Sequence, residues 1–85
     1  MKTFTYTIKD EVGIHARPAG MLSKLAKSFE SEILLSKNGR SVELRKLMML
    51  MGLGVKQGDT VTVTISGSDE ERAAEAISSF LEENL

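Results

Sequence analysis

The chain contains no cysteine, and it has only one histidine and one proline among its 85 residues. The lack of cysteine excludes disulfides and thiolate metal sites, and a single histidine leaves too few ligands for a zinc cluster. No apolar run approaches the length of a membrane-spanning helix, and residues 1–6 alternate polar and apolar side chains instead of forming a signal-peptide core. We therefore expect a cytoplasmic protein with no membrane insertion, no metal and no cofactor.

Aromatic residues are also scarce, since one tyrosine and three phenylalanines are the only ones. No run of arginine and lysine is interleaved with them, so we expect no nucleic-acid partner. Charge is unevenly distributed, because residues 15–58 carry eight Lys/Arg against three Asp/Glu, whereas residues 59–85 carry one against seven. A basic middle segment favours an acidic or phosphorylated partner through steering of the encounter.

The length of the chain predicts a single domain over residues 1–85 with one core. A domain of this size cannot enclose a deep cleft lined by several catalytic groups, and the sequence shows no second catalytic group beside its one histidine. We therefore expect a functional site on the surface, in a protein that is not an autonomous enzyme.

Four segments have the alternation or the turn signals of β-strands. The predicted strands cover residues 3–8, 32–37, 40–44 and 60–65. The first and the last alternate apolar residues with threonine, which predicts one covered face and one face in water; Phe4, Tyr6 and Ile8 form the apolar face of the first. The middle two flank Asn38-Gly39, a pair favoured in two-residue hairpin loops because both positions accept positive φ.

Three further segments are predicted to be helical, over residues 16–29, 47–51 and 69–83. The first carries apolar residues at the spacing of one buried stripe, namely Leu22, Leu25, Ala26 and Phe29. The last opens with a capping-box pattern, Ser68 to Glu71, and is expected to bury Ala73, Ala76, Ile77 and Phe80. This order predicts an α+β domain with helices on the apolar face of an antiparallel sheet. A ferredoxin-like strand order and other two-layer arrangements both fit the pattern.

The middle helix is apolar all round, since residues 47–51 read Leu-Met-Met-Leu-Met. If Leu50 and Leu53 point inward, then Leu47, Met48 and Met51 fall together on the outside. Unbranched thioethers repack against more than one partner, so this exposed group is a candidate docking surface. The alternative is a helix buried on nearly all sides.

The only histidine lies in the run Gly13-Ile14-His15-Ala16-Arg17-Pro18. Proline is tolerated only in the first turn of a helix, so the helix that follows must begin close to His15. The first N–H groups of a helix have no intrahelical partner and attract anions. Together with the Arg17 guanidinium, they could meet the oxygens of a phosphoryl group on His15. The alternative is a surface histidine that caps the helix poorly.

These motifs resemble the HPr family, the histidine-containing phosphocarriers of the phosphoenolpyruvate-dependent sugar phosphotransferase system. The resemblance is carried by residues 13–19, by the Asn38-Gly39 hairpin, and by Leu47-Met48, Met51, Leu53-Gly54 and Gly58. It implies an open-faced sandwich of four antiparallel strands with three helices on one face. It also implies that His15 accepts a phosphoryl group from phosphorylated enzyme I and passes it to enzyme IIA of sugar permeases.

The resemblance further implies roles for single residues. The phosphoryl group would be carried on Nδ1 of His15, stabilised by Arg17 and by the backbone N–H of Ala16, with Pro18 fixing the start of the helix. The implied docking surface consists of Arg17, Gly20, Lys24, Lys27, Leu47, Met48 and Met51. A shuttle that docks and leaves quickly is expected to be a monomer.

One position departs from the family pattern. Lys46 stands where Gram-positive members have a serine that a regulatory kinase phosphorylates, so this switch is expected to be absent. The alternative to a carrier is a regulatory binding module of the same fold, acting through Leu47, Met48 and Met51. Such a module would need neither His15 nor Arg17.

Overall fold

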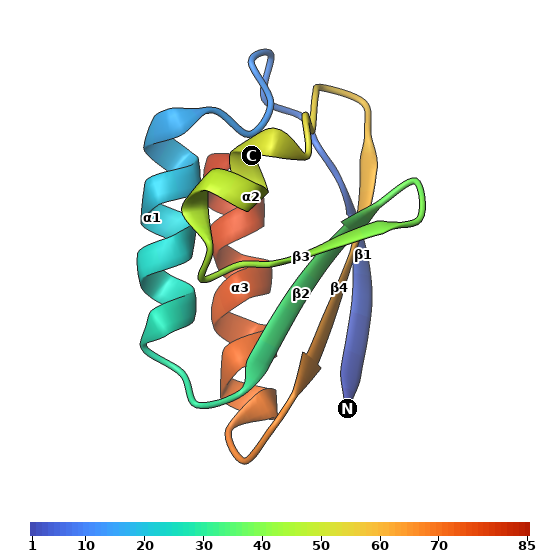
Figure 1. Ribbon diagram of the computed structural model, residues 1–85. Helices are drawn as coiled ribbons and strands as arrows, with labels where there is room; N and C mark the ends of the chain where they lie inside the picture. The colour runs from blue at the N-terminus through green and yellow to red at the C-terminus, as the bar shows by residue number, and fades with distance from the viewer.

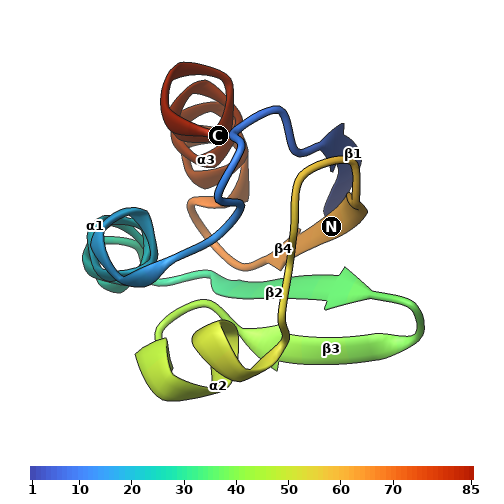
Figure 2. The ribbon, with the colours of Figure 1, turned by 90° about the horizontal axis from the view of Figure 1, so that it is seen from above.

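The molecule has two layers, a β-sheet and three helices that lie on one of its faces (Figures 1 and 2). The computed structural model describes residues 1–85. In chain order the elements are β1 (Lys2–Thr7), α1 (Ala16–Lys27), β2 (Glu32–Lys37), β3 (Arg40–Glu43), α2 (Leu47–Gly52), β4 (Thr60–Ser66) and α3 (Glu70–Asn84). The predicted α+β class and the open-faced sandwich are thereby confirmed.

The sheet is antiparallel throughout, with the strand order β1-β4-β2-β3. Val61, Val63 and Ile65 of β4 are fully buried, because this strand lies between β1 and β2 and the helices cover its apolar face. Phe4 and Tyr6 are only half-buried, since β1 is an edge strand. The strand order, which the sequence pattern left open, thus explains why burial differs between two strands of similar sequence.

The hairpin between β2 and β3 turns at Asn38 and Gly39, with Lys37 paired to Arg40. Asn38 has a φ of 51° and Gly39 a φ of 81°. Positive φ at both central positions is the requirement of a type I′ turn, whose twist matches that of the flanking strands. The predicted hairpin is therefore confirmed, and it fixes the register of β3 at the second edge of the sheet.

Helix α1 begins at Ala16 but ends at Lys27, so the predicted end at Phe29 is wrong. Leu22 and Ala26 are fully buried, whereas Leu25 and Phe29 are half-buried. The Ser28 hydroxyl donates to the Leu25 carbonyl oxygen at 2.6 Å, which helps to end the helix. Beyond this point the chain turns away from the helix axis towards β2.

Helix α3 begins at Glu70, and the predicted capping box is wrong. The Ser68 hydroxyl donates to Glu30 Oε2 at 2.9 Å instead of capping its own helix, and the Gly67 N–H donates to Glu70 Oε1 at 3.2 Å. The buried stripe of this helix is also displaced from the prediction. It consists of Ala73, Ile77 and Leu81, whereas Ala76 and Phe80 are half-buried.

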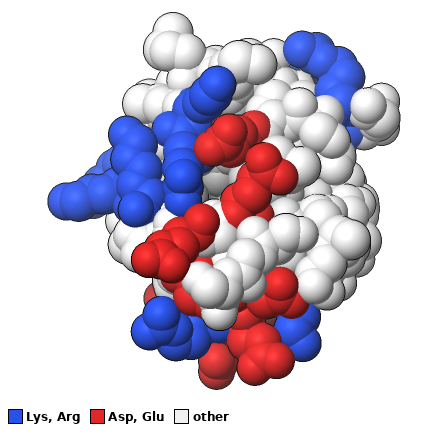
Figure 3. Space-filling model, turned by 60° about the horizontal axis from the view of Figure 1, so that its bottom comes forward, with Lys and Arg blue, Asp and Glu red and all other residues white.

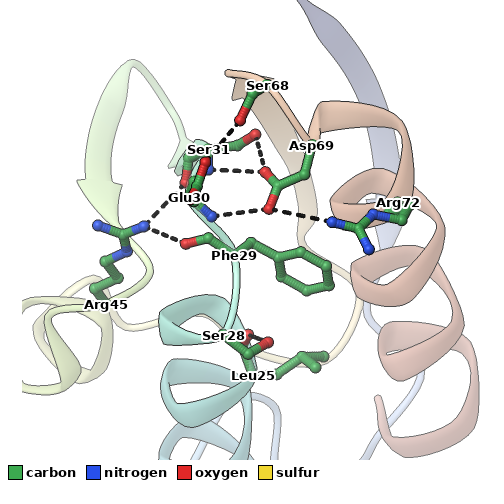
Figure 4. Close-up of polar contacts among 9 residues, drawn as sticks. All are labelled: Leu25, Ser28, Phe29, Glu30, Ser31, Arg45, Ser68, Asp69 and Arg72. Atoms are coloured by element: carbon green, nitrogen blue, oxygen red, sulfur yellow. Dashed lines mark hydrogen bonds and ion pairs between the residues drawn. The ribbon is translucent and has the colours of Figure 1, made fainter.

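Side chains from three segments meet where α1 ends and α3 begins, and we call this group the Asp69 network (Figure 4). Its members are Phe29, Glu30, Ser31, Arg45, Ser68 and Asp69. The Asp69 carboxylate accepts the N–H groups of Glu30 and Ser31, each at 2.9 Å, and the Ser31 hydroxyl at 2.5 Å. Arg45 Nη2 donates to the carbonyl oxygens of Phe29 at 2.5 Å and Ser31 at 3.3 Å.

These contacts tie the β4–α3 loop to the start of β2. The hydrogen bonds lower the pKa of Asp69 to about 2, chiefly through the Ser31 hydroxyl and then the Glu30 N–H. Gly67 adjoins the network with a φ of 154°, and a Cβ at this position would lie 2.5 Å from Cα of Ser31. Only glycine fits there without displacing backbone.

Candidate functional site

His15 lies directly before the first residue of α1, in an extended conformation with φ −112° and ψ −177°. It occupies the N-cap position, but its side chain makes no capping hydrogen bond. The ring is 43% exposed. A capping role for the imidazole is therefore not what the structure shows, and the ring is accessible to a partner.

The loop before His15 is fixed by the backbone. The Gly13 N–H donates to the Asp10 carbonyl oxygen at 3.1 Å, and the Ile14 N–H donates to the Val55 carbonyl oxygen at 3.1 Å. Gly13 has a φ of 78°, and a Cβ on it would lie 2.8 Å from Cα of Lys56. Glycine is thus required at this position by both conformation and space.

The start of α1 leaves backbone donors free. The first helical hydrogen bond runs from the Ala19 N–H to the His15 carbonyl oxygen at 2.9 Å. The N–H groups of Ala16 and Arg17 precede it and have no backbone acceptor, while Pro18 has no N–H to satisfy. Pro18 lies in this first turn, as predicted, and is also buried. An anion beside the His15 ring would therefore meet two unpaired donors and the positive end of the helix dipole.

His15 and Arg17 line one side of a shallow hollow of about 230 Å³ together with Pro18, Met21 and Asn84. The structure thus brings together the histidine, the arginine and the proline of the predicted site. Asn84 comes from the far end of α3, and its side-chain amide donates to the Phe80 carbonyl oxygen at 3.0 Å. Sequence reasoning missed Asn84, because nothing local to it shows that α3 ends beside the start of α1.

A carboxylate also faces the ring. Asp10 Oδ2 lies 3.7 Å from Nε2 of His15, and the Asp10 side chain is 28% exposed. Sequence reasoning missed this neighbour as well. The one available signal was the turn at Gly13, which folds the chain back so that residues five apart approach each other.

Helix α2 packs against α1 and β3, near the end of the molecule where α1 begins (Figure 1). Leu50 is fully buried and Leu53 is 6% exposed, which confirms their predicted inward orientation. Met48 is 79% exposed and Met51 38% exposed, so the alternative of a helix buried on all sides is wrong. Leu47 is only half-buried against the core, so the prediction that it lies wholly outside is corrected.

The predicted basic positions of α1 lie on its accessible surface. Arg17, Lys24 and Lys27 are exposed, and a Cβ added at Gly20 would meet only open space. Lys24 also lines an apolar groove of about 520 Å³ between α1 and α3, together with Met21, Leu25, Ser28 and Phe80. Figure 3 shows the largest group of basic side chains at the left of the view and acidic ones across the middle and at the bottom, with further basic side chains at the top right and bottom.

Lys46 occupies the N-cap of α2, where its carbonyl oxygen accepts the Leu50 N–H at 3.0 Å. Its side chain is exposed and makes no capping hydrogen bond. The negative charge of a phosphoserine at this position would interact favourably with the positive end of the α2 dipole. Lysine instead places a positive charge there.

Comparison with known proteins identifies the family to which the chain belongs. Residues 2–83 match a protein-family model whose description is "PTS HPr component phosphorylation site", where PTS is the phosphotransferase system. The chain belongs to the HPr family. The phosphocarrier protein HPr of Mycoplasma genitalium is 44% identical over 85 residues, which cover 99% of this chain and 97% of that protein.

Solved structures of the HPr family agree with the fold. The crystal structure of an HPr from Thermoanaerobacter tengcongensis has a TM-score of 0.93 at 38% identity, covering 98% of this chain and 93% of the other. A crystal structure of an HPr dimer from the same organism has a TM-score of 0.78 at 38% identity, over 98% of this chain and 95% of that one. The chain is a phosphocarrier of the phosphotransferase system, a carrier rather than a catalyst. None of its helices combines the length and the apolar character needed to cross a membrane.

Proposed function

We propose that His15 accepts a phosphoryl group from phosphorylated enzyme I and donates it to enzyme IIA of sugar permeases. The observation that carries this proposal is the accessible His15 ring beside the unpaired N–H groups of Ala16 and Arg17 at the start of α1. Membership of the HPr family supports the direction of the relay, from enzyme I to enzyme IIA.

The transfer is a substitution at phosphorus. The lone pair of His15 Nδ1 forms a bond to phosphorus, and the bond between phosphorus and the donor atom of enzyme I breaks, leaving its electron pair on enzyme I. The reverse events at enzyme IIA release the group from Nδ1. Because catalysis of phosphoryl transfer depends mainly on positioning and electrostatic stabilisation, a small domain with one nucleophile can take part without a cleft of its own.

The chain's own groups hold the phosphoryl oxygens between these two events. The Ala16 N–H and the Arg17 guanidinium supply charge-assisted hydrogen bonds, each contributing about 1.5–3 kcal/mol at best and less where water competes. Arg17 is exposed, so its contribution falls at the low end. Pro18 fixes the helix start from which these donors project. Moderate stabilisation suits a carrier, because the group must leave again.

Docking is proposed to involve the predicted set of Arg17, Gly20, Lys24, Lys27, Leu47, Met48 and Met51. Met48 and Met51 are the exposed apolar part of this set, and the lysines add positive charge beside them. Leu47 supports the surface from a half-buried position. Thioethers adapt to two partners of different shape, which is what a shuttle between enzyme I and enzyme IIA requires.

The proposal extends to the state of the protein in the cell. Residues 1–85 act as one domain and as a monomer in the cytoplasm, where enzyme I can load it. A relative forms an HPr dimer. Sedimentation of this chain at micromolar concentration decides between the two states, and a dimeric mass would overturn the monomer.

The test of the proposed function is intact mass after incubation with phosphoenolpyruvate and enzyme I. We expect one added phosphate that brief acid treatment removes, and none in His15→Ala, a variant that keeps the circular dichroism and Tm of the natural chain. Added phosphate on His15→Ala would overturn the assignment of the site. No added phosphate on the folded natural chain would favour a binding module that acts through α2.

A further inference from the structure

We infer that Asp10 is a positioning residue for His15. Its carboxylate holds the proton of the neutral imidazole on Nε2 and so leaves the lone pair on Nδ1. The inference rests on the proposed function, since it concerns how the same nitrogen becomes the phosphoryl acceptor. Its starting observation is that Asp10 Oδ2 lies 3.7 Å from His15 Nε2.

Two backbone hydrogen bonds place Asp10 independently of its side chain. Its N–H donates to the main-chain oxygen of Leu85 at 2.8 Å, and its carbonyl oxygen accepts the Gly13 N–H at 3.1 Å. The Ile14 N–H is bound to Val55, so the residue just before His15 is fixed as well. The carboxylate therefore has a defined place beside the ring, and His15 Nε2 is the polar group that it approaches.

A neutral imidazole carries its proton on one of two nitrogens, and the partner of each nitrogen decides between them. A carboxylate can only accept, so Asp10 favours the tautomer with the proton on Nε2. Nδ1 is then unprotonated and able to attack phosphorus. Arg17, which lines the same hollow as His15, and the N–H groups at the start of α1 are donors only. They favour an unprotonated Nδ1 and bind the group that arrives there.

The contact between Asp10 and His15 Nε2 also has a role after the phosphoryl group has been transferred to His15. When Nδ1 has bonded to phosphorus, the proton remains on Nε2 and the ring carries positive charge, which the Asp10 carboxylate offsets. When the phosphoryl group leaves for enzyme IIA, the electron pair of the broken bond returns to Nδ1 and the original tautomer is restored. No proton has to enter or leave the ring during a cycle.

The chain provides a matched control for this assignment. Glu11 is the next residue in the same loop, is exposed, and forms no ion pair with His15. Asp10→Asn removes the charge with little change of shape, and Glu11→Gln removes the same charge one position away. Both variants shift net charge and the long-range field equally, so a difference between them reports the local contact.

The experiment measures the ¹⁵N chemical shifts of the two His15 ring nitrogens in the unphosphorylated protein, at a pH well above the ordinary titration range of histidine. We expect a dominant Nε2–H tautomer in the natural chain and in Glu11→Gln, and a loss of this dominance in Asp10→Asn. Loading by phosphorylated enzyme I should slow about two- to fivefold in Asp10→Asn only, the effect expected of a partly exposed charge pair.

Identical nitrogen shifts in all three proteins would overturn the role of Asp10. Asp10→Ala provides a second variant and should lose the tautomer preference as Asp10→Asn does, because the two backbone bonds of residue 10 do not use its side chain. If the natural chain accepted no phosphate, the proposed function would fail, yet the nitrogen shifts would still decide whether Asp10 sets the tautomer.

Discussion

The two ends of helix α1 use their polar groups in opposite ways. At its start the His15 ring and the N–H groups of Ala16 and Arg17 make no hydrogen bond within the chain. At its other end the Asp69 network satisfies the donors of Glu30 and Ser31 and the carbonyl oxygens of Phe29 and Ser31. Hydrogen-bonding groups are thus left free at the proposed site, whereas most of them are bonded where the layers are joined, with Arg45 Nε the exception. The proposed site and the network that joins the layers thus lie at opposite ends of one helix.

The largest effect is expected from Gly67→Ala, next to the Asp69 network, which tests whether this end of α1 contributes to stability and not to loading. A Cβ would lie 2.5 Å from Cα of Ser31 and the φ of 154° disfavours alanine, so we expect a loss of about 2–5 kcal/mol in the free energy of unfolding. Urea unfolding measures this loss, while loading of the folded variant by enzyme I should be unchanged. Gly20→Ala is the control, since it lies inside α1 with open space around its Cβ and should gain up to about 1 kcal/mol. Equal midpoints for the two variants would contradict the close packing at Gly67.

At the start of the helix, Arg17→Ala should have the opposite profile. Loss of an exposed charge-assisted contact is expected to slow loading by enzyme I about tenfold, with Tm unchanged. Rapid-quench kinetics measure the rate. Arg40→Ala removes an equally exposed arginine from the β2–β3 hairpin and should leave the rate unaffected. If both variants slowed loading equally, the effect would belong to net charge and not to Arg17.

A smaller effect is expected from Met48→Ala. Met48 is 79% exposed in the free protein, and burying it against enzyme I should contribute about fivefold in affinity. The KM for this chain in the enzyme I reaction should rise while kcat stays constant. Met49→Ala is the comparison on the same helix, because Met49 is 54% exposed but lies outside the predicted surface. A larger effect at Met49 would move the docking surface around α2.

The smallest predicted effect is a pH dependence of stability at the Asp69 network. The pKa of Asp69 in the folded chain is lowered to about 2, below its value of about 3.9 in an unfolded chain. Its stabilisation is therefore complete above about pH 4 and is lost as the pH falls through about 2. We expect Asp69→Asn to have a Tm several degrees lower at neutral pH, and this gap to close in acid.

Thermal unfolding of both proteins between pH 7 and pH 2 tests this expectation. The pKa of Asp59 is also lowered, by its hydrogen bond from Lys37 and then by the Lys56 N–H, so both proteins keep some sensitivity to acid. Only the difference between them belongs to Asp69. A gap that stayed constant over the whole range would show that Asp69 acts without its charge.

Much of the fold could be predicted from local sequence. The threonine alternation in β4, the Asn38-Gly39 turn and the proline at the start of α1 each dictate a conformation within a few residues. The errors occurred where distant segments compete for the same group. Ser68 lies in the sequence context of a capping residue, yet its hydroxyl donates to Glu30, which is 38 positions away.

The same distinction applies to the site. His15, Arg17 and Pro18 lie together because they are neighbours in sequence, and the methionines of α2 could be separated from Leu50 by helical spacing alone. Asn84 and Asp10 could not be found in this way. Their places depend on where α3 ends and on how the loop before His15 folds back, and both follow from tertiary packing.

The strand order has a consequence for how the chain is made. β1 pairs only with β4, so Lys2 has no strand partner until Ile65 has been synthesised. The β2–β3 hairpin forms from adjacent residues, but β4 is also the strand that joins this hairpin to β1. Contacts between such distant positions are slow to form, because a long loop must close before they can contribute stability. On the ribosome, β1 is synthesised well before β4 and is therefore among the last of these strands to find its place in the sheet.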